Sequence, residues 1–194
     1  MDPLGDSGLR QALLCRLNAA HGTNPNALVI EELGLRHGRA RVDVAIVNGF
    51  LEGFEIKSRK DTLRRLPRQI SIYETVLDRV TLVCDETHVH EALDLIPTCW
   101  GVVSGHVGEN SELSLEDIRE PTPNSQVEAL AVAKLLWREE ALSELERLGK
   151  DDGVRSAPRR RLYRRLVEVL DIEALKERVR LRLRSRTDWR VDES

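Results

Sequence analysis

The sequence predicts an α/β protein with a mixed central sheet, flanking helices and a C-terminal helical extension. Short β-type apolar runs alternate with segments of helical spacing up to residue 104, and beyond about residue 125 only helical spacing recurs. With 194 residues and 41% hydrophobic content, the chain is long enough to bury a sizeable core. We expect residues 1–120 to form the sheet domain and residues 121–194 a helical region packed on or beside it.

The expected elements follow from periodicity and from turn and capping signals. A helix begins at Ser7 as its cap and ends near Gly22. It is followed by a strand within 26–35 and by strands at 42–46 and 54–56 around a turn. A helix within 58–78 has a Ser58–Asp61 capping box and a bend or restart at Pro67. The remaining elements are a strand at 79–84, a helix within 88–97, a strand within 99–105, one edge strand within 112–125, and helices near 125–148 (capped by Ser125 and Glu128), at 157–170 and at 172–186.

The hairpin between the second and third strands carries the charged residues of interest. Side chains on a strand alternate between faces, and residues paired across a hairpin point the same way. A two-residue loop at Asn48-Gly49 would place Asp43 and Glu55 on opposite faces and would also divide the apolar residues between the faces. A three-residue loop with a bulge instead gathers the apolar residues on one face. The hydrophobic pattern therefore predicts that Asp43, Glu55 and Lys57 converge on the other face.

Two neighbouring carboxylates in a partly buried sheet repel each other, so a cation is needed to keep both ionised. Oxygen ligands from Asp43 and Glu55, completed by the main-chain carbonyl of Ile56 and by water, suit Mg²⁺ or Mn²⁺. Such an ion polarises a phosphate oxygen and activates a bound water, and the charge of Lys57 would orient that water or stabilise negative charge on phosphorus. One alternative stays open, because a cross-strand ion pair with Lys57 on a solvated face needs no metal.

The same residues resemble the motif of a known family, the PD-(D/E)XK nuclease superfamily. The matching residues are Asp43, then Glu55-Ile56-Lys57 on the next strand, then Gln69 and Tyr73 on the following helix. This Q-x-x-x-Y helix resembles the RecB-like branch, and "GFEIKS", "DTLRRLPRQ" and "WGVV" resemble a poorly characterised family of short stand-alone bacterial proteins with that fold. The resemblance covers about residues 27–104 and implies a restriction-endonuclease-like αβββαβ core. The motif's proline is Val42 here, at a position that faces the core.

The resemblance implies a metal-dependent nuclease that hydrolyses phosphodiester bonds, with DNA preferred to RNA, in DNA repair or in defence against foreign DNA. In such an enzyme Asp43 and Glu55 hold the metal, and Lys57 acts on the attacking water. Gln69 and Tyr73 share a helix face because they are four residues apart, and they flank the site to contact substrate or order the ligands.

Two assignments in this implied site have alternatives. An upstream acid often completes sites of this family, and Glu32 is preferred to Glu31 because it directly precedes Leu33-Gly34 in "EELG". Tyr73 has a purely structural alternative, in which a buried hydroxyl is satisfied by polar neighbours.

The charge distribution favours a nucleic-acid partner. The net charge is −3, but residues 151–194 carry 13 Lys+Arg against 9 Asp+Glu, so the rest of the chain carries −7. The basic residues that can receive a phosphate backbone are Arg41, Arg59, Lys60, Arg64, Arg65 and Arg68 near the hairpin, and Arg159, Arg160, Arg161, Arg164 and Arg165 in the tail. A solvated helix face is the alternative for any of them. The amphipathic tail equally suits a homodimer or a protein-partner interface.

Two functions other than a nuclease stay open, a non-catalytic nucleic-acid-binding subunit and a protein-interaction subunit, both with a nuclease-like fold. The three cysteines form no CxxC pair and are too scattered for a disulfide framework. No run approaches the ~20 apolar residues of a membrane span, and the N-terminus lacks a leader pattern. We therefore expect a cytoplasmic protein without a membrane partner.

Overall fold

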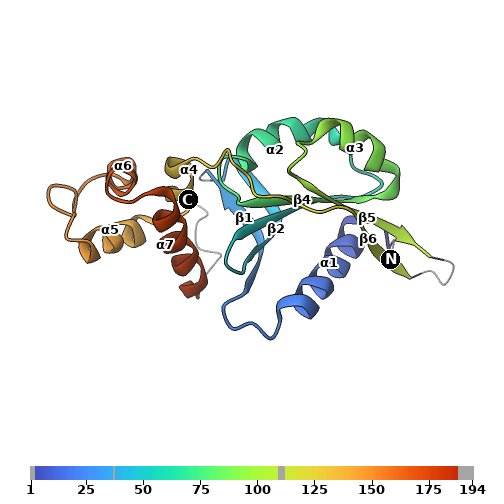
Figure 1. Ribbon diagram of the computed structural model, residues 1–194, viewed down its shortest axis with the longest axis horizontal. Coiled ribbons are helices and arrows are strands. Elements are labelled where there is room, and N and C mark those ends of the chain that lie inside the picture. Colours follow the sequence, from blue (N-terminus) through green and yellow to red (C-terminus); the bar gives the residue numbers. More distant parts are fainter. Residues whose placement is uncertain (1–2, 37, 109–111, 188–194) are drawn as a thin grey trace. The chain divides into compact units, whose positions relative to one another are not determined.

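A computed structural model of the protein describes residues 3–36, 38–108 and 112–187 (Figure 1). The chain divides into two compact units, Met1–Gln126 and Val127–Ser194. The first unit contains a mixed six-stranded sheet flanked by helices, and the described part of the second is helical. The predicted α/β class with a C-terminal helical extension is therefore confirmed. The domain boundary at residue 120 and the packing of the two domains on each other stay predictions.

The first unit follows the expected element order. Its elements are α1 (Asp6–His21), β1 (Leu28–Leu35), β2 (Ala40–Val47), β3 (Leu51–Lys57), a short 3₁₀ helix (Leu63–Arg65), α2 (Leu66–Tyr73), β4 (Arg79–Asp85), a second 3₁₀ helix (Glu86–His88), α3 (Val89–Leu95), β5 (Gly101–Val107) and β6 (Leu113–Arg119). The strands lie in the order in which they occur in the sequence. Strands β3, β4 and β5 run parallel, and the other neighbouring pairs are antiparallel.

Helices cover both faces of this sheet, with α1 on one face and α2 and α3 on the other (Figure 1). The apolar stripe of α1, formed by Leu9, Leu13 and Leu17, is buried as its spacing predicts. It packs against a layer of sheet residues, namely Val44, Ile46, Ile56, Val83 and Val103. Because β2 and β3 place these residues toward α1, their alternate positions point toward α2.

Two helix starts in this unit differ from the prediction. Helix α1 begins at Asp6 with Gly5 as its N-cap, so Ser7 lies inside the first turn. The segment expected to be one helix from residue 58 becomes regular α-helix only at Leu66. The Ser58 main-chain N–H and hydroxyl both donate to Asp61, at 2.8 and 2.6 Å, but this contact closes a turn and caps no helix. Pro67 lies in the first turn of α2, where its missing N–H leaves no hydrogen bond unmade.

The second unit contains four helices among its described residues, α4 (Ala129–Ala133), α5 (Arg138–Arg147), α6 (Arg159–Val169) and α7 (Ile172–Ser185). The expected cap by Ser125 and Glu128 is wrong, because α4 begins at Ala129 without a side-chain cap. The expected helices near 125–148 are α4 and α5, and they separate before Trp137, whose main-chain N–H donates to Glu140 at 2.7 Å at the start of α5. In the described part of the chain, no helix has the length and apolar content required to cross a bilayer.

Candidate functional site

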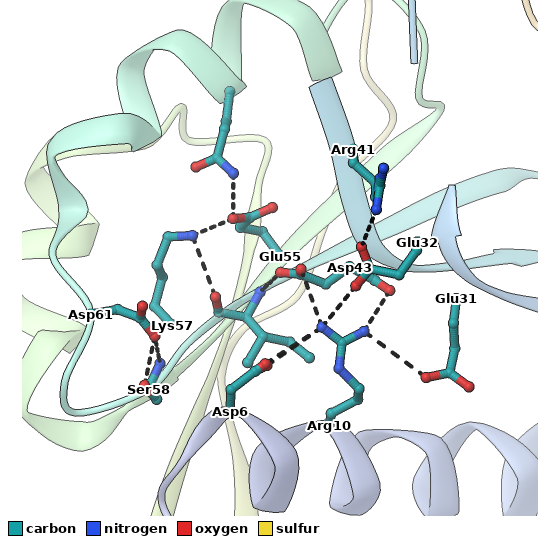
Figure 2. A network of polar contacts seen from close by, with 12 residues as sticks. Asp6, Arg10, Glu31, Glu32, Arg41, Asp43, Glu55, Lys57, Ser58 and Asp61 are labelled. Carbon is teal, nitrogen blue, oxygen red and sulfur yellow. Dashed lines mark hydrogen bonds and ion pairs between the residues drawn. The ribbon is translucent and has the colours of Figure 1, made fainter. Parts of the chain in front are cut away.

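The β2–β3 hairpin has the register that the hydrophobic pattern predicts. Val44 pairs with Phe54 and Val47 with Leu51, which leaves a three-residue loop. Gly49 in this loop has a φ of 116°, a conformation that L-residues rarely adopt. This ladder ends at Val44 and Phe54, and beyond it the Asp43 carboxylate accepts from the main-chain N–H of Ile56, the residue next to Glu55. The structure thus brings Asp43, Glu55 and Lys57 together (Figure 2).

Glu55 is the buried centre of this cluster, with only 2% of its surface exposed. One carboxylate oxygen forms an ion pair with Lys57 and also accepts a hydrogen bond from the Gln69 side chain. The other oxygen accepts from the Tyr73 hydroxyl at 2.6 Å. Gln69 and Tyr73 reach it together because they lie one turn apart on α2, whose inner face covers this part of the sheet.

Tyr73 is held from several sides. Its hydroxyl oxygen lies 2.7 Å from the main-chain carbonyl of Arg41 as well as beside Glu55, so one hydroxyl proton serves two acceptors. Its ring stacks on Trp100 with 6.0 Å between ring centroids. Burial, followed by the charge of Glu55, raises the pKa of Tyr73 well above its usual range. The hydroxyl therefore stays protonated and acts as a hydrogen-bond donor.

Asp43 is half-buried and has a different set of partners. One of its oxygens accepts from the main-chain N–H of Ile56 at 2.7 Å, and the other lies 3.3 Å from the Arg10 guanidinium. Burial and the nearby charge of Glu55 raise the pKa of Asp43 to about 6, against the opposing effects of Ile56, Arg10 and Lys57. The two carboxylates are thus close enough to repel each other, as the hairpin register predicts.

Arg10 on α1 is the residue that sequence reasoning missed. Its guanidinium lies 3.1 Å from Glu32, 3.4 Å from Asp6 and 4.0 Å from Glu31, in addition to its contact with Asp43 (Figure 2). The sequence does contain one indication of this role. Arg10 directly follows Leu9 of the apolar stripe of α1, and a long side chain at such a position can reach the sheet. Four carboxylates around it become visible only once α1 is placed on the sheet.

Glu32, the expected upstream acid, lies in this outer layer. It contacts Arg10 and, at 3.5 Å, Arg41. Its φ of 58° is unusual for a non-glycine residue inside a strand. No group of three or more His, Cys, Asp or Glu side chains within the described residues is arranged to hold a metal ion. The role of Glu32 beside Asp43 and Glu55 therefore stays a prediction.

Several exposed basic side chains lie on β2 and in the segment that follows β3. The Arg41 side chain is 61% exposed, and that of Arg59 is 53% exposed although it pairs with Asp85 at 3.3 Å. Four more exposed cations follow β3, namely Lys60, Arg64, Arg65 and Arg68. This part of the chain thus combines the buried Glu55 and the half-buried Asp43 with six exposed cations, which we call the basic rim.

The fold and the site define a mixed α/β protein in which a hairpin and two helices enclose a network of carboxylates and cations. The family whose sequence pattern matches residues 5–191 is described as bacteriophage P4 protein cII. This match covers most of the chain, which therefore belongs to the bacteriophage P4 protein cII family. Protein cII of Enterobacteria phage P4 is 30% identical over 128 residues, which are 66% of this chain and 48% of that protein. The chain thus spans about half the length of this curated relative. No solved structure matches the chain.

These findings correct the family assignment made from the sequence. The match over residues 5–191 and the curated relative both point to protein cII, and neither points to a PD-(D/E)XK nuclease or to the family of short bacterial proteins with that fold. The predicted hydrolase activity, and with it the role in repair or defence, is therefore wrong. The physical reason lies in the motif itself. Lys57, Gln69 and Tyr73 all donate to Glu55, so this spacing builds an internal polar network whether or not a reaction takes place.

Proposed function

We propose that this protein binds nucleic acid, with DNA preferred, through a Mg²⁺ or Mn²⁺ ion held by Asp43, Glu55 and the main-chain carbonyl of Ile56. The proposal concerns binding and includes no hydrolysis. The observation that carries it is the close approach of the two carboxylates, because burial and the charge of Glu55 make the charged form of Asp43 unfavourable. A divalent cation between them removes this repulsion, and its remaining coordination positions accept phosphate oxygens.

The charge balance of the cluster supports a cation. Around the hairpin, five carboxylates meet three cationic side chains, which leaves an excess of two negative charges. The carboxylates are Asp6, Glu31, Glu32, Asp43 and Glu55, and the cations are Arg10, Arg41 and Lys57. One Mg²⁺ ion has the charge that neutralises this excess.

Gln69 supplies a second, independent indication. Its side-chain nitrogen donates to Glu55, whereas its side-chain oxygen is buried and has no hydrogen-bond partner among the described residues. A buried acceptor without a donor is unfavourable by about 1–3 kcal/mol. A water molecule on a hydrated cation beside Glu55 would donate to this oxygen. The residues present therefore fit a hydrated oxygen-ligand ion.

The protein's own donors set a limit on the affinity. Lys57, Gln69 and Tyr73 already bind both oxygens of Glu55, and Arg10 and the Ile56 N–H bind those of Asp43. A cation has to compete with these groups, and Arg10 is the most exchangeable because it has three other carboxylates within 4.0 Å. We therefore expect millimolar rather than micromolar affinity in the absence of nucleic acid.

The basic rim supports a polyanionic ligand for this ion. Arg41 and Arg59 extend into solvent beside the cluster, where they can pair with phosphates on either side of the one bound to the metal. We also propose that the protein acts in the cytoplasm. Its cysteines, of which Cys15 is exposed and Cys84 buried, are free thiols, as suits a reducing compartment.

Thermal unfolding with and without MgCl₂ or MnCl₂, at matched ionic strength, tests the ion site. The wild-type midpoint should rise with either metal, and that of Asp43→Asn should not. Glu91→Gln is the matched control, because Glu91 is an exposed carboxylate on α3 away from the cluster. An equal metal-induced rise in all three proteins contradicts the proposal.

Binding of a fluorescent DNA duplex tests the ligand. Mg²⁺ should tighten binding relative to EDTA in the wild-type protein, and Asp43→Asn should lose this increment. Identical affinities in Mg²⁺ and EDTA for the wild-type protein count against a metal-bridged phosphate. The expected homodimer or protein partner of the C-terminal helices stays a prediction, which light scattering would check.

A further inference from the structure

The second unit pairs most of its arginines with carboxylates. Glu144 on α5 is fully buried and receives three of them, with Arg147 at 3.0 Å, Arg178 at 2.7 Å and Arg182 at 2.6 Å. Glu140 receives Arg186 at 2.6 Å. Further pairs join Arg155 with Asp151 and Arg165 with Glu168. In the described part of this unit, arginine pairing is thus the rule.

The first two turns of helix α6 are the exception, apart from Arg165. Arg159, Arg160, Arg161 and Arg164 are all exposed, and none of their side chains has an ion pair or hydrogen bond within the described residues. All four lie in the first two turns of α6, whereas its apolar residues Leu162, Tyr163 and Leu166 are buried against the rest of the unit. We refer to these four arginines as the α6 arginine face.

This placement is electrostatically unfavourable in the free protein. The N-terminal end of a helix carries partial positive charge, and the first turn of α6 contains no acidic residue to balance it. Arg160 and Arg164 are also i, i+4 neighbours, and Arg161 and Arg164 are i, i+3 neighbours, so like charges lie side by side. Packing within the unit explains the apolar residues of α6 but gives no reason for four unpaired cations. A bound polyanion would neutralise all of them.

We propose that the α6 arginine face binds the phosphate backbone of nucleic acid, as a second contact surface that needs no metal ion. The inference rests on the proposed function for the identity of the polymer, and it adds where the second unit contacts it. Arginine forms paired hydrogen bonds with phosphate oxygens, and four of them within two turns follow successive phosphates. The proposal concerns contacts to phosphates, which carry no sequence information by themselves.

An anionic membrane is a less suitable partner for this face. A helix that lies on a bilayer inserts exposed apolar side chains beside its basic residues. On α6 the large apolar side chains are already used inside the unit, since Leu162 and Leu166 are 0% and Tyr163 is 1% exposed. The exposed part of the first two turns is purely cationic, which suits the highly charged backbone of DNA or RNA.

The test compares the full chain with two variants at the four positions. One variant carries glutamine at all of them (Arg159→Gln, Arg160→Gln, Arg161→Gln, Arg164→Gln), and the matched control carries lysine at the same four positions. Affinity for a fluorescent duplex is measured by anisotropy over a range of NaCl concentrations, in EDTA and again in Mg²⁺. Each phosphate contact contributes about 0.9 to the slope of log affinity against log salt, so four contacts contribute about 3.6.

We expect the glutamine variant to bind at least about tenfold more weakly near 100 mM salt and to lose about 3 from its salt slope. The lysine variant should keep most of the affinity and most of the salt slope. The melting temperature of the glutamine variant should equal or exceed that of the wild type, because its substitutions remove like-charge repulsion. This result excludes a merely structural role, which predicts a lower melting temperature.

Unchanged affinity and salt slope in the glutamine variant would overturn the inference. So would loss of binding to phosphatidylserine vesicles with DNA binding unaffected, which would assign the face to membranes. The metal arm separates this inference from the proposed function. If the glutamine variant is weakened equally in EDTA and Mg²⁺ while Asp43→Asn changes nothing, the α6 arginine face stands and the metal-bridged site does not.

Discussion

Replacing Glu144 by glutamine should destabilise the helical unit more than any other single loss of charge among its described residues. The carboxylate is buried at the centre of three guanidinium groups from α5 and α7. Burial alone would raise its pKa, but hydrogen bonds from Arg178, Arg147 and Arg182 outweigh this effect and lower the pKa to about 2. Glutamine preserves the size of the side chain but leaves three cations without their counter-charge.

The magnitude follows from the pKa. A fall from 4.5 to about 2 corresponds to roughly 3 kcal/mol in favour of the charged form, at about 1.4 kcal/mol per pKa unit. Because the three arginine side chains are between 27% and 45% exposed, water restores part of this energy when the carboxylate is lost. We therefore expect a loss of about 2 kcal/mol at pH 7. In the wild type this contribution is present above pH 4.5 and disappears as the pH falls through about 2.

Hydrogen–deuterium exchange of the full chain, followed on peptides from residues 138–186, measures the stability of this unit directly. Glu168→Gln is the matched control, because Glu168 is 66% exposed and its ion pair among the described residues is with Arg165 on the same helix. That substitution should change the opening free energy by less than about 0.5 kcal/mol. If Glu144→Gln has an effect as small as the control, the argument that this buried carboxylate organises the unit is refuted.

Three further predictions concern the sheet unit. In EDTA, Asp43→Asn should become more stable relative to the wild type by about 2 kcal/mol as the pH rises from 4 to 7, measured by urea unfolding. The reason is that the pKa of Asp43 is raised to about 6 in the folded protein, so protonation of Asp43 stabilises the wild type at low pH and this stabilisation is lost as the pH rises through about 6. Tyr73→Phe removes a hydroxyl that serves Glu55 and a main-chain carbonyl, and it should cost about 1–3 kcal/mol by the same measurement. Gly105→Ala places a methyl group 2.3 Å from the end of the Leu9 side chain, and it should lower the stability by about 1–3 kcal/mol, since that fully buried side chain has to move.

Each of these predictions has a clear contrary outcome. A pH-independent difference between the wild type and Asp43→Asn would mean that burial and the charge of Glu55 do not raise the pKa of Asp43. If Tyr73→Phe leaves the free energy of unfolding unchanged, water satisfies the Glu55 carboxylate and the Arg41 carbonyl in place of the hydroxyl. For Gly105, the matched control is Gly34→Ala, because Gly34 is exposed and has no neighbouring atom within 4 Å; equal effects of the two substitutions would mean that the contact with Leu9 costs nothing.

The sequence by itself determined the parts of the fold that rest on local periodicity. The stripe of Leu9, Leu13 and Leu17 fixed one face of α1, and alternation along β2 and β3 fixed the three-residue loop that brings Asp43 near Glu55. These inferences hold because side-chain direction on a helix or strand depends only on spacing. Helix starts were less predictable, since Ser58 and Asp61 bind each other in a turn where the same pair also suits a helix cap.

Only the tertiary structure decided which charges meet. Arg10 lies 33 residues from Asp43, and Glu144 lies 34 from Arg178, so no spacing rule connects them. The sequence also could not distinguish a nuclease motif from an internal network, because Lys57, Gln69 and Tyr73 at this spacing suit both. Charges interact through space, so the partner of each charge depends on how α1 packs on the sheet and how α5 and α7 lie together. The local sequence pattern does not contain that information.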